Sequence, residues 1–354
     1  MKPVKIALMG AGLIGREHAR FLKANQEAEL AGIADPAPSA QQLAAELDVP
    51  YFSDYEDLLS HVSLDGAIVA LPNSMHREAG IACIRTGIPT LIEKPVADTE
   101  EAALAIIEAA GAADVPVLIG HQRRHSPDIV RAKQLISGGQ LGQIVTVNGM
   151  CQIKKENQYF DNLWRQQPGG GPILINLIHD IDTLRYLIGD IHSVHAVTSN
   201  NVRKFAVEDS AAVILKFTNG SLGTLLLSDS VASPWCWDLN SGQGAYFPHT
   251  PADAYHIGGT EGSLAIPSMK LYKHADGGDW HDPLIVEKHE IAESHAYAAQ
   301  LQHFIDIIRT GAEPLIGARD GLMTLAATLG VGRSAAENRE VFMDELLPMA
   351  EHSV

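Results

Sequence analysis

The chain has 354 residues, of which 46% are hydrophobic and 19% charged, and its formal net charge is −17. This length suggests two domains. The negative charge disfavours binding to nucleic acid, and no segment has the ~20 consecutive apolar residues of a membrane span. The N-terminus has no pattern of a secretion signal. Three scattered cysteines without a CxxC pair, together with scattered histidines, predict neither disulfides nor a metal site, so we expect a cytoplasmic protein without metal.

Short apolar runs alternate with helical patterns over the first 120 residues. The apolar runs cover residues 4–9, 30–34, 67–71, 90–92 and 115–120. Regular alternation with nearly all-apolar strands predicts a parallel sheet covered by helices on both faces. We therefore expect a doubly wound α/β Rossmann domain over residues 1–121.

A glycine loop joins the first expected strand to the first expected helix, with the sequence Gly10-Ala11-Gly12-Leu13-Ile14-Gly15. The first glycine permits a tight turn, the second lets the backbone approach a pyrophosphate, and the third lets helix and strand pack closely. The free N–H groups at the helix N-terminus would bind the phosphates. We assign this loop, Leu13 and Ile14 included, to cofactor binding; a glycine turn without ligand is the alternative.

Asp35 follows Gly15 by twenty positions, at the end of the next apolar run. Its carboxylate could accept hydrogen bonds from the adenosine ribose, whereas it would repel a 2′-phosphate. No Arg or Lys follows closely to neutralise such a phosphate. The pattern therefore favours NAD over NADP, the alternative being that Asp35 is a solvated turn residue.

The pattern changes after residue 120 and predicts an antiparallel α+β domain over residues 122–354. Helices are expected over 127–136, 173–187, 296–309 and 319–338, and strands over 144–153, 194–198, 211–217 and 222–228. Asn219-Gly220 between the last two strands is a strong hairpin signal. Residues 230–262 show little periodicity, and a loop of that length is expected to be functional.

Three motifs narrow the choice of family. They are Glu93-Lys94-Pro95, Pro72-Asn73-Ser74-Met75-His76, and Gly169-Gly170-Gly171 followed by His179-Asp180-Ile181-Asp182. With the glycine loop they resemble the Gfo/Idh/MocA family, which includes glucose-fructose oxidoreductase and inositol dehydrogenase, over nearly the whole chain. The resemblance implies a C-terminal domain with a large, mostly antiparallel open sheet. It also implies a homodimer or homotetramer formed through that sheet.

The resemblance further implies hydride transfer to nicotinamide from a secondary hydroxyl of a small sugar, sugar lactone, cyclitol or cyclic diol. Lys94 matches the family lysine and is assigned to cofactor and substrate binding and to stabilising the oxyanion. His179 matches the family histidine and is assigned as general acid/base and substrate ligand. Asp182 could orient His179. The alternative for Lys94 is a lysine that only extends its ammonium to the surface. The alternative for His179 is a core histidine whose hydrogen bonds are made within the protein.

The chain departs from the family at Ile175, where many members have an aspartate. Asn176 is the nearest polar residue and, at three positions before His179, would share its helix face. We expect Asn176 to bind a substrate hydroxyl or the histidine, although an amide cannot carry a proton.

Further residues are assigned by position alone. We expect Asn73, His76, Glu93, Gln122 and Arg123 to line the cofactor site, although His76 could cap its helix and Arg123 could form a salt bridge. We expect Trp164, Arg165 and Trp235, with Trp237 beside it, to hold a hydroxylated ring; burial against the protein is the alternative.

Two other functions remain open from the sequence. A non-enzymatic NAD(P)-binding sensor or regulator of the same fold is one, and Ile175 supports it. An enzyme that holds NAD tightly for internal redox is the other.

Overall fold

The computed structural model describes residues 2–244 and 247–347. The chain forms two compact units, one taking residues up to 125 with 295–325, the other taking 126–294 with the residues from 326 on. The sequence placed the boundary at residues 121 and 122 and did not predict that 295–325 group with the first unit. They do so because α9 (Ala296–Thr310) packs on α1 (Leu13–Ala24), where the Tyr297 ring meets the His18 ring edge-on.

The first unit has a six-stranded parallel sheet in the order β3-β2-β1-β4-β5-β6. Its strands are β1 (Val4–Met9), β2 (Ala28–Ala34), β3 (Tyr51–Phe52), β4 (Gly66–Val69), β5 (Thr90–Glu93) and β6 (Val117–Gly120). Its other helices are α2 (Pro38–Leu47), α3 (Tyr55–His61), α4 (His76–Arg85) and α5 (Glu100–Ala113). The strand order reverses between β1 and β4, which is the point where such sheets bind ligands. The predicted doubly wound Rossmann domain is confirmed.

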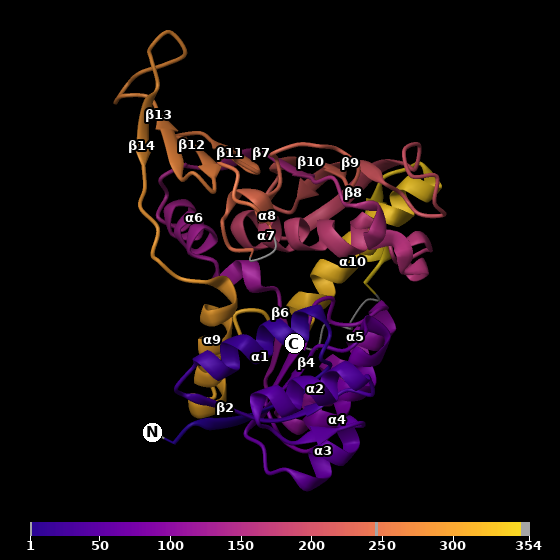
Figure 1. Cartoon of the computed structure of the whole chain (residues 1–354). Helices are drawn as coiled ribbons and strands as arrows, with labels where there is room; N and C mark the ends of the chain where they lie inside the picture. The colour runs from indigo at the N-terminus through magenta and orange to yellow at the C-terminus, as the bar shows by residue number, and fades with distance from the viewer. Residues whose placement is uncertain (1, 245–246, 348–354) are drawn as a thin grey trace. The chain divides into compact units, whose positions relative to one another are not determined.

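The second unit has a nine-stranded sheet in the order β14-β13-β12-β11-β7-β10-β9-β8-β15 (Figure 1). The strands are β7 (Ile144–Gln152), β8 (Ile191–Ser199), β9 (Ser210–Phe217), β10 (Leu222–Ser228), β11 (Tyr255–Gly259), β12 (Ser263–Ile266), β13 (Lys270–Lys273), β14 (Ile285–Lys288) and β15 (Val341–Phe342). Neighbouring strands are antiparallel except β7 and β10, which are parallel. The large, mostly antiparallel open sheet is confirmed, as is the hairpin at Asn219-Gly220, where Gly220 has φ +88°.

One face of this sheet is covered and the other is open. Side chains alternate between buried and exposed along β9, and α6 (Pro127–Ser137) and α7 (Ile178–Ile188) lie on the same side of the sheet (Figure 1). The opposite face exposes apolar side chains, namely Val197, Ile214, Leu222 and Leu226. In the described part of the chain, no helix has the length and apolar character needed to cross a membrane.

Two local expectations were wrong in part. The segment 230–262 is not a structureless loop, because it contains α8 (Trp237–Asn240) and the interior strand β11, which pairs with β7. The expected helix over 173–187 begins as a π-helix (Ile173–Leu177) and continues as α7. In the π-helix the N–H of Ile178 bonds to the carbonyl of Ile173, five residues back, a geometry often found at functional sites.

Candidate functional site

The glycine loop has the backbone geometry that a dinucleotide requires. Gly10 has φ +95°, and a Cβ there would lie 2.3 Å from the Ala70 carbonyl oxygen. A Cβ on Gly15 would lie 2.0 Å from the Gly10 carbonyl oxygen, so helix and loop approach as closely as backbones can. A Cβ on Gly12, by contrast, would meet nothing within 4 Å, and Gly12 is the N-cap of α1. An open backbone at a helix N-terminus fits a pyrophosphate.

Asp35, directly after β2, holds this loop in place. One carboxylate oxygen accepts the N–H of Ala11 at 2.8 Å, and the other accepts the N–H of Ala37 at 2.7 Å. Each oxygen can accept a further hydrogen bond, so the carboxylate can still bind ribose hydroxyls. Asp35 therefore has a structural contact to the glycine loop in addition to the role predicted for it.

The segments after β4 and β5 are joined by His76, the first residue of α4. Its Nδ1 lies 2.8 Å from the Pro95 carbonyl oxygen and its Nε2 lies 2.8 Å from the Leu71 carbonyl oxygen. The side chain is 1% exposed and does not cap its own helix. His76 thus positions the segments that carry Asn73 and Lys94, and the helix-cap alternative does not hold.

Glu93 forms a buried pair with His18 of α1, whose Nε2 lies 2.7 Å from the Glu93 carboxylate. The second carboxylate oxygen accepts the N–H of Lys94 at 3.1 Å. Burial raises the pKa of Glu93, but the hydrogen bond from His18 and the charge of Lys94 outweigh it and bring the pKa below its usual value. Glu93 therefore fixes the backbone of Lys94 against α1, and its carboxylate faces the protein.

The remaining expected cofactor residues lie in the 3₁₀ turn 122–125 that follows β6. Gln122 is half-buried, and Arg123 is among the largest fully buried side chains of the chain. The neighbouring Arg124 pairs with Asp320 at 2.5 Å, within the same unit. The structure thus keeps both residues at the carboxyl end of the parallel sheet, where ligands bind in such folds.

In the second unit, the π-helix carries Asn176, and His179 follows in the first turn of α7; both are half-buried. We expected Asn176 and His179 to share a helix face because three positions separate them in an α-helix. Asn176 lies in a wider π-turn, so that spacing no longer predicts a shared face. The Asn176 amide oxygen instead accepts a hydrogen bond from Lys155 Nζ at 2.7 Å.

Lys155 was not identified from the sequence. It follows β7 in a loop, and its ammonium lies 4.6 Å from the centroid of the Tyr159 ring. Burial lowers the pKa of Lys155 to about 8; Asp229 opposes this shift, and the charges of Arg203 and Arg165 add to it. A lysine in a loop has no local sequence signal that predicts a role. Its contact to Asn176 is what indicates that Lys155 belongs to the candidate site.

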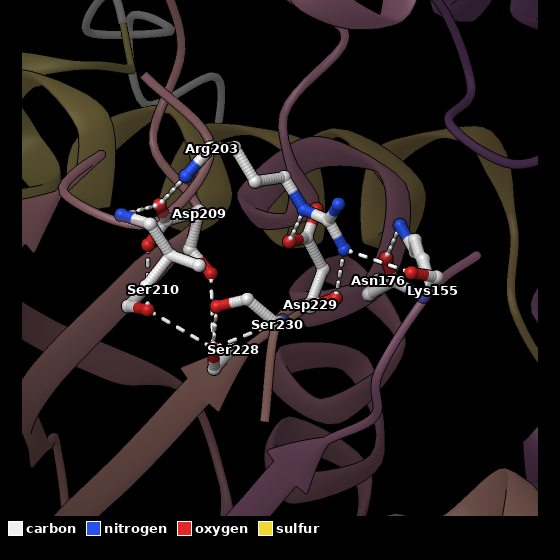
Figure 2. A network of polar contacts seen from close by, with 9 residues as sticks. Lys155, Asn176, Arg203, Asp209, Ser210, Ser228, Asp229 and Ser230 are labelled. Carbon is white, nitrogen blue, oxygen red and sulfur yellow. Dashed lines mark hydrogen bonds and ion pairs between the residues drawn. The ribbon is translucent and has the colours of Figure 1, made fainter. Parts of the chain in front are cut away.

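A buried ion pair supports this loop (Figure 2). Arg203 Nε donates to Asp229 at 2.5 Å, and one terminal nitrogen of Arg203 donates to the Lys155 carbonyl oxygen at 3.0 Å. Asp209 accepts the N–H groups of Val202 and Arg203 at 2.8 and 2.9 Å. The Lys155 backbone is therefore anchored to the end of β10.

The expected aromatic residues of this unit have different outcomes. Trp164 and Trp235 are 49% and 44% exposed, as a ring platform for a ligand would require. Trp237 is 2% exposed and its indole N–H donates to Asp128 at 2.7 Å, so the expectation that it stacks on a ligand was wrong. Arg165 packs its guanidinium 3.8 Å from the centroid of the Tyr159 ring.

Within residues 2–244 and 247–347, no three His, Cys, Asp or Glu side chains are grouped to hold a metal ion. The three cysteines are buried thiols, and Cys151 and Cys236 have their sulfurs 3.8 Å apart. Asn176 and His179, with Lys155 and with Glu208, which accepts the N–H of Ile173 at 3.0 Å, are thus among the polar and titratable groups of the second unit at the π-helix and the start of α7.

Comparisons with known proteins agree with this geometry. The family described as "Oxidoreductase family, NAD-binding Rossmann fold" matches residues 4–121, and the GFO/IDH/MocA C-terminal domain matches residues 129–265. The chain is similar to scyllo-inositol 2-dehydrogenase (NAD(+)) of Bacillus subtilis (strain 168), with 27% identity over 354 residues that cover 96% of each chain. It is 28% identical to 2,7-anhydro-N-acetylneuraminate hydratase of Escherichia coli (strain K12) over 233 residues, 63% of this chain and 61% of that protein.

Its fold is similar to that of levoglucosan dehydrogenase, solved in complex with NADH and levoglucosan. The TM-score is 0.79 at 20% identity, over 97% of this chain and 100% of that one. The predicted family, enzyme class and cofactor, NAD, are confirmed. The chain belongs to the GFO/IDH/MocA family of oxidoreductases, with an NAD-binding Rossmann fold in its first unit.

Proposed function

We propose that this protein is an NAD-dependent dehydrogenase that oxidises a secondary hydroxyl of a sugar, sugar lactone, cyclitol or cyclic diol. The observation that carries the proposal is the open Gly12 backbone at the start of α1, in a chain of this family. Asp35 holds this loop by accepting the N–H of Ala11. The full-length similarity to an inositol dehydrogenase supports the substrate class.

Lys94 and His179 have separate roles in the proposed reaction. NAD, which the glycine loop and Asp35 would hold, would supply the acceptor for the hydride of the carbinol carbon. Lys94 stabilises the developing negative charge on the substrate oxygen, since a cation at that atom lowers the barrier to proton loss. His179 takes the hydroxyl proton, and a histidine has a pKa suited to that transfer near neutral pH.

The aspartate position of the family holds Ile175, which cannot carry a proton. The second candidate function, internal redox with tightly held NAD, is supported by the similarity to a hydratase. Stoichiometric NAD that survives purification, together with turnover that needs no added NAD, would favour this candidate over the dehydrogenase.

The test is a substrate panel. Aldoses, inositols and cyclic diols are incubated with NAD or NADP while the absorbance of the reduced cofactor is followed. We expect turnover with NAD, and a loss of about 10²- to 10⁴-fold in His179→Ala, the range typical of a general acid/base. Full activity in His179→Ala would refute its role. Cofactor binding without turnover on any substrate would point to a sensor instead.

We also propose a homodimer or homotetramer formed through the open face of the nine-stranded sheet. Ile214 and Leu226, both exposed apolar residues on this face, support it. Sedimentation velocity of the wild type and of Ile214→Lys should show an oligomer that dissociates in the variant. A monomeric wild type would refute the proposal.

A further inference from the structure

We propose that the substrate carries a carboxylate, and that Lys155 and Arg165 bind it. The inference rests on the proposed dehydrogenase function and narrows its substrate class. It starts from two cations of the second unit that lie against one aromatic ring.

Lys155 and Arg165 both contact Tyr159. The ammonium of Lys155 lies 4.6 Å from the ring centroid, and the guanidinium carbon of Arg165 lies 3.8 Å from it. Two like charges that share a ring repel each other unless an anion lies between or beside them. The acidic group that acts most strongly on Lys155 is Asp229, and Arg203 already pairs with it at 2.5 Å.

The hydrogen bonds of both cations leave donors for a ligand. Lys155 donates to the neutral Asn176 amide oxygen, and Arg165 donates to the Tyr159 carbonyl oxygen at 2.6 Å. Among the residues that the structure describes, neither cation forms an ion pair with a carboxylate, and Arg165 Nε has no acceptor. An ammonium has three N–H donors and a guanidinium five, so most of these donors are unused. A carboxylate would accept charge-assisted hydrogen bonds from both groups.

The charge of the surroundings favours a monoanion over a phosphate. The charge of Asp229 opposes the lowering of the Lys155 pKa. Burial raises the pKa of Glu208 above its usual value, and the charge of Lys155 opposes that rise. The negative charge of these two groups offsets part of the positive charge of Lys155 and Arg165, so less positive charge is left to neutralise a second charge on the ligand. A carboxylate therefore fits the two cations better than a phosphate does.

The location of the pair connects it with the proposed chemistry. Lys155 is hydrogen-bonded to Asn176, three residues before His179 in the π-helix and α7 segment (Figure 2). A carboxylate held by Lys155 would therefore lie in the same part of the second unit as the proposed proton acceptor. Arg165 is next to the exposed Trp164, whose ring lies 5.5 Å from its guanidinium carbon, so the loop also offers an apolar surface to a sugar ring.

The experiment measures equilibrium binding by the full chain with saturating NADH, so that turnover is not needed. The probes are matched pairs, D-glucuronate with D-glucose and D-galacturonate with D-galactose, and D-glucose 6-phosphate is added as a dianion. Calorimetry gives each dissociation constant. We expect at least one uronate to bind about tenfold or more tightly than its parent aldose and than the sugar phosphate.

The variants assign that preference to the two cations. Lys155→Met and Arg165→Met should each remove most of the preference for the uronate, measured as the ratio of the aldose to the uronate dissociation constant. Lys155→Arg, which keeps the charge, should retain part of it. Lys154→Met is the matched control, because Lys154 is the exposed neighbouring lysine, and it should bind like the wild type.

Three results would overturn the inference: equal binding of uronate and aldose, tighter binding of the sugar phosphate, or an unchanged preference in Lys155→Met and Arg165→Met. A variant that fails to fold is recognised by circular dichroism, and Lys155→Arg then decides the role of the charge. Tight uronate binding without any oxidation would support the carboxylate site while refuting the proposed dehydrogenase. Oxidation of neutral sugars with no preference for uronates would support the proposed dehydrogenase and refute the carboxylate site.

Discussion

Replacing Asp35 by alanine tests the cofactor assignment most directly. The substitution removes a carboxylate that accepts the N–H groups of Ala11 and Ala37, the first of which lies inside the glycine loop. It also removes the group proposed to bind the adenosine ribose and to repel a 2′-phosphate. We therefore expect weaker NADH binding and a smaller discrimination against NADPH.

The magnitude follows from the hydrogen bonds that are lost. A hydrogen bond to a charged acceptor contributes about 1.5–3 kcal/mol, and one such bond to the ribose corresponds to a roughly 10- to 100-fold change in the dissociation constant. The hydrogen bond from Ala11 is partly buried and the one from Ala37 is exposed, so water replaces the carboxylate in part. The free protein should lose at most about 1–3 kcal/mol of its free energy of unfolding.

Fluorescence titration of NADH and NADPH measures the two dissociation constants, and urea unfolding without cofactor measures the stability. Glu46→Ala is the control, because Glu46 is an exposed carboxylate in α2, directly after the same strand and turn. We expect the affinity ratio of NADH to NADPH to fall at least tenfold in Asp35→Ala alone. An unchanged ratio would show that Asp35 only braces the loop and that its proposed ribose contact is wrong.

Three further predictions concern the loop and the second unit. Gly15→Ala should weaken NADH binding about tenfold or more, because its Cβ would lie 2.0 Å from the Gly10 carbonyl oxygen; wild-type affinity in a fluorescence titration would contradict the geometry of the loop. Arg203→Met should cost about 3–5 kcal/mol in urea unfolding, because it leaves the 2% exposed Asp229 carboxylate without a partner, and Arg203→Met with Asp229→Leu should recover much of that loss. Uronate affinity should fall as the pH rises through about 8, because the Lys155 ammonium loses its proton there. The charges of Asp229, Arg203 and Arg165 all act on this ammonium. Calorimetry that finds constant affinity from pH 7 to 9 would exclude Lys155 as the cation.

The sequence alone determined the parallel sheet of the first unit and its cofactor loop. The spacing of Gly10, Gly12 and Gly15 and the position of Asp35 are local constraints, because each depends on backbone conformation within one strand, turn and helix. Nearly all-apolar runs predict buried parallel strands in the same way. The family motifs around Lys94 and His179 were also readable, since they are contiguous.

Only the tertiary structure decided the surroundings of the proposed substrate site. Lys155 lies 21 residues from Asn176 along the chain, and its partners are brought together by the loop after β7 and by Asp229 at the end of β10. The placement of β11 inside the sheet, and of residues 295–325 in the first unit, likewise depends on pairing and packing between distant segments. Periodicity records which side of an element is buried, but not which element covers it. A cation in a polar loop leaves no periodic signal at all, because its role is set by distant charges and hydrogen-bond acceptors rather than by its neighbours in the sequence.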